Sequence, residues 1–283
     1  MWVLLAVDAL AVLVVYSALD VRELYNVSRE GIIGGTSRAL VQLNFPIALV
    51  AIPLAILALG ALPRRAWVAG APAIALCALV PVTVDPGDLD ARPRNALPAL
   101  GVVLAVVLTV AAARRAGAGP APRRAGDPLR VAVAVAVVLV SLPWLTAEAG
   151  FHLPGGVFLT DEPYAEPGEA PTAAVHLGHH HGFAGTLLVL SALLLSRPRL
   201  AGARLSHAYA ALVSLLLAYG AANLVQDLWH EQVVKRGWTS ADIPSVLLPG
   251  LSPMWALVLA GAALAYGLGF ARRAEPVEPA IIL

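Results

Sequence analysis

The chain has 283 residues, of which 59% are hydrophobic and only 13% are charged, and its net charge is +1. A soluble domain carries about 25% charged residues, so this composition excludes an ordinary water-covered surface and favours one that lipid covers. The net charge itself says little, because the charges are unevenly spread along the chain, and no nucleic-acid partner is expected. The single cysteine, Cys77, excludes an intrachain disulfide and a cysteine-based metal site.

Apolar runs of membrane length dominate the chain. A helix that crosses a bilayer needs about 20 mainly apolar residues. The runs lack the alternation of barrel strands, and an open sheet could not satisfy its backbone in lipid. The sequence therefore predicts an all-α fold: a single integral-membrane domain over residues 1–283, built as a polytopic bundle of about eight transmembrane helices. The predicted spans are 2–18, 43–62, 67–84, 96–113, 131–148, 182–196, 207–225 and 251–270.

The loops between these spans differ in charge. Those after the second, fourth, sixth and eighth spans carry 12 of the 19 basic residues. Loops rich in Arg and Lys stay in the cytoplasm, so we predict a multi-pass plasma-membrane protein with both termini inside. The other loops hold most of the carboxylates and six of the seven histidines. Nearly all potential metal ligands are therefore predicted to face the periplasm or cell exterior.

The stretch VHLGHHHGFAG, residues 175–185, contains four of the seven histidines and leads into the sixth predicted span. If it is helical, His176, His179 and His180 share one face at positions i, i+3 and i+4. His181 then points elsewhere and is not assigned as a ligand. Because imidazole is the commonest metal ligand in proteins, this face is predicted to bind a metal ion.

Two more ligand groups lie at neighbouring span ends. Asp227, His230 and Glu231 end the seventh span at i, i+3 and i+4, and Glu148 and His152 share a face if the fifth helix continues. We expect the fifth, sixth and seventh spans to converge there around a transition metal ion, Fe, Cu or Zn. The predicted ligands are His152, His176, His179, His180, Asp227 and His230. The predicted catalytic bases are Glu148 and Glu231.

Simpler interpretations exist for several of these residues. A lone histidine near an interface, such as His152 or His207, is commonly an ordinary headgroup-facing side chain. Asp227 and Glu231 are compatible with a solvated helix end that pairs with Lys235 or Arg236. GIIGG, residues 31–35, is predicted as a flexible turn. An intramembrane carboxylate such as Asp8 is a functional candidate by default, but it is predicted near the inner end, away from the histidines.

These residues favour an integral-membrane metalloprotein at the outer membrane face, either an oxidoreductase or a hydrolase that acts on a lipid-like substrate. The expected partners are membrane lipid and other membrane subunits. Two alternatives stay open. One is a cation or metal transporter, although transporters place ionisable groups near the midplane and these spans contain few. The other is an accessory subunit of a larger membrane complex that holds haem between facing histidines.

Overall fold

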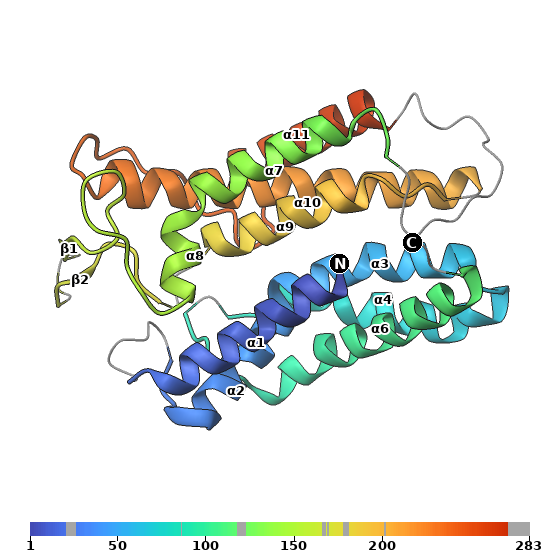
Figure 1. Cartoon of the computed structure of the whole chain (residues 1–283), viewed down its shortest axis with the longest axis horizontal. Helices are drawn as coiled ribbons and strands as arrows, with labels where there is room; N and C mark the ends of the chain where they lie inside the picture. The colour runs from blue at the N-terminus through green and yellow to red at the C-terminus, as the bar shows by residue number, and fades with distance from the viewer. Residues whose placement is uncertain are drawn as a thin grey trace.

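The structure, a computed structural model, is a bundle of helices that mostly run along its long axis (Figure 1). The two short strands, β1 (Pro163–Tyr164) and β2 (Thr172–Ala173), pair antiparallel beyond the helices, and the end that carries them is called the hairpin end. The residues described are 1–20, 27–85, 87–117, 123–165, 168, 170–177, 181–200 and 202–270.

The N-terminal half forms one group of helices and the C-terminal half forms another (Figure 1). The first half contains α1 (Trp2–Ala18), α2 (Gly31–Gln42), the π-helix η2 (Leu43–Ile47), α3 (Ala48–Ala61), η3 (Arg64–Ala66), α4 (Trp67–Cys77), α5 (Val80–Thr83), η4 (Pro93–Asn95) and α6 (Ala96–Ala116). The second half contains α7 (Asp127–Val140), α8 (Leu142–Glu148), α9 (His181–Leu195), α10 (Ala203–Trp229), the π-helix η5 (His230–Val234) and α11 (Pro253–Gly269).

Apolar helices occupy the positions of the predicted spans, but fewer than eight have membrane length. Among the described residues, three helical segments are long and apolar enough to cross a membrane: Gly31–Ala61, Pro93–Ala116 and Ala203–Val234. The pair α7 and α8 is a fourth candidate, bent by 64° at its break. Helices α1, α9 and α11 are apolar but shorter. The structure therefore supports three or four spans, and the count of eight stays a prediction.

Proline explains one break that the apolar pattern does not show. The predicted span 131–148 is split at Ser141, between α7 and α8, and Pro143 lies in the first turn of α8. Proline has no N–H to donate, and its ring clashes with the carbonyl four residues earlier. The second helix therefore turns away from the axis of the first, and α8 crosses the bundle at the hairpin end (Figure 1).

A non-helical stretch, residues 238–252, explains why α11 is short. It runs back along α10, because Trp229 Nε1 donates to the Ala241 carbonyl at 2.8 Å and Tyr219 Oη donates to the Leu247 carbonyl at 2.8 Å. Ten residues of helix separate these two donors, about 15 Å along the α10 axis. The chain thus returns some way down α10 before α11 begins, and its carbonyls are satisfied by side chains of that helix.

The segment predicted as a flexible turn, GIIGG, is instead the first part of α2. A Cβ added at Gly35 would lie 2.0 Å from Ser17 Oγ and 2.3 Å from the Leu13 carbonyl oxygen. Gly35 therefore allows close packing of α2 on α1, as small residues do where helices cross. The turn prediction was wrong because glycine marks both turns and tight helix contacts.

The outward faces of several helices are apolar. Val3 on α1 is 78% exposed, Leu129 on α7 is 70% exposed and Leu268 on α11 is 76% exposed. The most enclosed helix is α3, whose middle residues are nearly all buried. A soluble bundle places polar residues on its outer faces, so these helices have the pattern of a molecule whose surroundings are apolar.

Candidate functional site

Helices α8, α9 and α10 meet at the hairpin end. The backbone N–H of Gly182 donates to Asp227 Oδ2 at 2.6 Å, so a carboxylate of α10 caps the first turn of α9. Trp144 of α8 is fully buried against the same turn, where a Cβ on Gly182 would lie 2.4 Å from the indole ring. Helices α8, α9 and α10, which belong to the fifth, sixth and seventh predicted spans, therefore converge around Gly182 as expected.

This junction brings two histidines together. His181 is the first residue of α9 and His230 is the first residue of η5, and the two side chains interact electrostatically. His181 was predicted to point away from the face that His176, His179 and His180 share. Because His179 and His180 lie outside the described residues, that orientation stays a prediction. The prediction assumed a helix through residues 176–180, whereas His176 and Leu177 are not helical. We call His181, Gly182, Asp227 and His230 the α9–α10 mouth.

The other predicted ligands are placed differently. His176 precedes the helix, and its Nδ1 lies 3.1 Å from the Ala173 carbonyl oxygen. His152 is exposed, because α8 ends at Glu148 and Gly150 follows with a φ of +84°. Glu148 and His152 therefore share no helix face. His179 and His180 lie outside the described residues. Within the described ranges, no group of three or more His, Cys, Asp or Glu side chains could hold a metal ion.

Glu231 lies in a buried ion pair and not at a solvated helix end. Its two carboxylate oxygens are 3.0 and 3.2 Å from Lys235 Nζ, and both side chains are almost fully buried. Lys235 Nζ also donates to the Ala174 carbonyl at 2.5 Å and lies 5.0 Å from the centre of the Tyr164 ring. The pair thus ties η5 to the β1–β2 hairpin. The role of Glu231 as a catalytic base stays a prediction.

A second buried polar group, missed by the sequence analysis, joins α1, α2 and α8. Gln42 Nε2 donates to Asp8 Oδ2 at 3.0 Å, and Arg38 Nη1 donates to Gln42 Oε1 at 3.4 Å. The Arg38 guanidinium lies 5.3 Å from the centre of the Tyr16 ring. Glu148 interacts electrostatically with Arg38 and Asp8. We call these five residues the α1–α2 cluster.

The cluster changes the assignment of two residues. Glu148, predicted as a base beside the histidines, faces α1 and α2. Asp8, predicted far from the ligand groups, lies near Glu148, since α8 turns across the bundle. A signal was present in the sequence: Arg38 and Gln42 are polar residues four apart, directly before an apolar run. The spacing of four residues has meaning only in a helix, and residues 31–42 were predicted to lie in a loop.

No protein-family model matches the chain, and no curated protein or solved structure matches it. The features that bear on function are the two polar groups, the α9–α10 mouth and the α1–α2 cluster, and the apolar surface around them.

Proposed function

We propose first that the chain is an integral-membrane protein with eight spans, both termini in the cytoplasm and the hairpin end outside. The exposed apolar faces of α1, α7 and α11 support a lipid environment, because monomeric soluble proteins rarely expose large contiguous apolar patches. The bias of Arg and Lys toward alternate loops supports the orientation. Spans shorter than 20 residues cross a bilayer when it thins locally around them.

The orientation can be tested with single cysteines. The native Cys77 is buried and should react little. In intact cells, a membrane-impermeant thiol reagent is expected to label Asp161→Cys, in the loop before the hairpin, and not Arg65→Cys, between α3 and α4. Both wild-type side chains are exposed, so access to solvent is matched. Permeabilised cells should show labelling of both. Labelling of Arg65→Cys alone in intact cells would invert the topology.

We propose second that this membrane protein binds a transition metal ion, Fe, Cu or Zn, at the α9–α10 mouth. The observation that carries the proposal is the electrostatic interaction of His181 with His230, next to the hydrogen bond from Gly182 N–H to Asp227 Oδ2 that joins the start of α9 to α10. His179 and His180 directly precede His181 in the sequence. Imidazole-rich ligation suits these three metals, and a nearby carboxylate commonly orients such ligands.

The proposed activity is that of a metal-dependent oxidoreductase or hydrolase with a lipid-like substrate. A metal ion at this position would supply redox chemistry with oxygen, or would lower the pKa of a bound water for hydrolysis. The mouth lies at the hairpin end of an apolar bundle, where water from outside and an apolar molecule from the bilayer could meet. His181 and His230 would hold the ion, and Asp227 would keep the start of α9 in place.

Metal content tests this proposal. The purified wild-type protein is expected to contain about one equivalent of metal, and His181→Ala combined with His230→Ala should lose it. His207→Ala is the matched control, because His207 lies near the opposite end of α10 and contacts Tyr266 Oη at 2.5 Å. Size-exclusion profiles would verify folding. Full metal retention in the double variant, or equal loss in the control, would remove the assignment of this site.

A further inference from the structure

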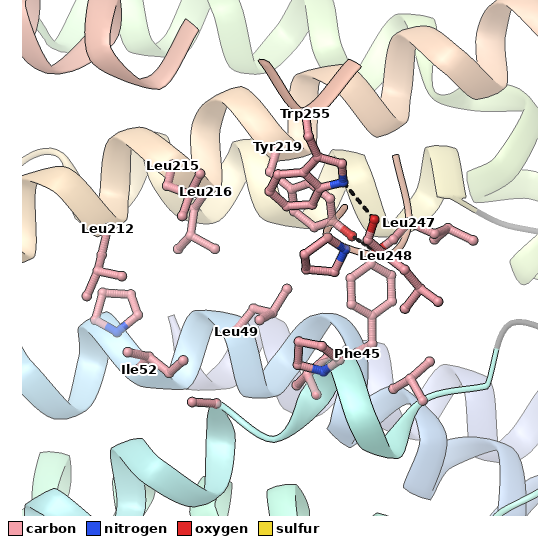
Figure 2. Close-up of a pocket in the computed structure, with 16 residues that line it drawn as sticks. Phe45, Leu49, Ile52, Leu212, Leu215, Leu216, Tyr219, Leu247, Leu248 and Trp255 are labelled. Carbon is pink, nitrogen blue, oxygen red and sulfur yellow. Dashed lines mark hydrogen bonds between the residues drawn. The ribbon is translucent and has the colours of Figure 1, made fainter. Parts of the chain in front are cut away.

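An apolar cavity of about 310 Å³ lies between α3, α5 and α10 (Figure 2), and no residue of either polar group lines it. The residues before and at the start of α11 complete its wall. All of its lining side chains are aliphatic, proline or aromatic. Those that define its length are Phe45, Leu49, Ile52, Leu212, Leu215 and Tyr219. The cavity is large enough for part of a small molecule, since ligand pockets begin at about 300 Å³.

The cavity is elongated along the helices. On α10, Leu212, Leu215 and Tyr219 follow each other at i, i+3 and i+7, which covers about 10 Å of helix axis. On the opposite side, Phe45 and Ile52 are also seven residues apart, across η2 and α3. Figure 2 shows the two rows facing one another. This shape suits a linear chain better than a compact ring system.

The polar side-chain atoms in the wall are already engaged. Tyr219 Oη donates to the Leu247 carbonyl at 2.8 Å, and Trp255 Nε1 donates to the Leu248 carbonyl at 2.7 Å (Figure 2). The Trp255 ring also stacks on Tyr219, with ring centres 5.4 Å apart. A polar ligand would lose its bonds to water and gain none from these groups, which is costly. A hydrocarbon chain makes no hydrogen bonds to water, so it loses none when it enters the cavity.

The cavity is open on one side. Pro81 of α5 and Leu248 both line it and are also exposed. Helix α11 packs mainly against α10. Because the helices would stand across the bilayer, these exposed lining residues would face the lipid chains sideways.

We propose that this cavity binds one acyl chain of a membrane phospholipid, which enters sideways between α5 and the residues before α11. The inference rests on the membrane location proposed above and is independent of the metal site. The lipid headgroup stays outside the cavity, since the walls offer it no polar partner. Failure of the metal assignment, or an inverted orientation, would leave this proposal unchanged, and only failure of the membrane location would remove its basis.

Photolabelling tests the proposal. The full-length protein would be placed in vesicles of phosphatidylethanolamine and phosphatidylglycerol that contain a small fraction of a diazirine-bearing acyl phospholipid. After irradiation, peptides from residues 212–219 and 247–255 are expected to carry label that saturates as the probe increases. Leu215→Trp, which fills the cavity, should reduce that label about tenfold, the effect of a loss of about 1.4 kcal/mol in binding.

Leu257→Trp is the control, because Leu257 is 64% exposed on α11 and should carry only label that rises in proportion to the probe. A second filling variant, Leu49→Trp on α3, repeats the test if Leu215→Trp fails to fold. Cavity labelling that does not saturate, or that the filling variants leave unchanged, would overturn the proposal. A polyprenyl diazirine probe in the same vesicles should label the cavity less. Labelling by that probe alone would replace the acyl chain by an isoprenoid and refute the assignment.

Discussion

Lys235→Met is expected to lower the free energy of unfolding by about 3–5 kcal/mol, because it removes the cation that Glu231 contacts inside the protein. In the wild type, the Lys235 ammonium also holds the Ala174 carbonyl, so the same change loosens the β1–β2 hairpin from η5. Chemical denaturation in detergent micelles would measure the difference. Arg94→Met is the matched control, because the Arg94–Asp85 pair is solvent-exposed, and such pairs contribute at most about 1 kcal/mol.

The double variant Glu231→Gln with Lys235→Met should be clearly more stable than Lys235→Met alone, since it removes both charges together. Equal instability of the two would show that packing of the lysine stem, and not charge, accounts for the loss. A cost for Lys235→Met no larger than that for Arg94→Met would contradict the burial of this pair.

Gly185→Ala is expected to destabilise the protein by about 1–3 kcal/mol through overpacking. The added Cβ would lie 2.6 Å from the Gly220 carbonyl oxygen and 2.7 Å from the Leu224 backbone nitrogen, so α9 and α10 would have to separate. Thermal unfolding in detergent would measure the loss. Gly267→Ala on α11 is the control: its Cβ meets nothing within 4 Å, and alanine is the better helix former. Equal melting temperatures for the two variants would exclude a tight contact at Gly185.

The helical class and the positions of the apolar segments could be predicted from sequence, because runs such as 96–113 and 207–225 depend on composition alone. Breaks inside such runs could not. Phe45 leaves the helical conformation just before Pro46, and Pro143 begins a new helix, yet both lie within apolar sequence. Hydropathy measures how a residue partitions into lipid, and it contains no information on where a backbone bends.

The candidate site was only partly predictable, for a related reason. Convergence of the fifth, sixth and seventh segments followed from their order and their loops. Which face a histidine occupies depends on which residues are helical, and His176 lies outside α9 whereas His181 is its first residue, near His230. The α1–α2 cluster depends on α8 crossing toward Asp8. With Arg38 buried beside Asp8 and Glu148, the interior holds more ionisable groups than the apolar pattern predicts, and this favours the transporter alternative more than the sequence alone does.

X-ray absorption of the purified wild-type protein, recorded at the edge of whichever metal elemental analysis finds, tests the central claim most directly. The metal proposal predicts a stoichiometric ion with metal–nitrogen distances of about 2.0–2.1 Å and the multiple-scattering pattern of imidazole. The same signal should be lost when His181 and His230 are both replaced by alanine. A shell of oxygen atoms alone, a haem Soret band in the optical spectrum, or protein that stays metal-free after incubation with Fe, Cu and Zn would contradict it.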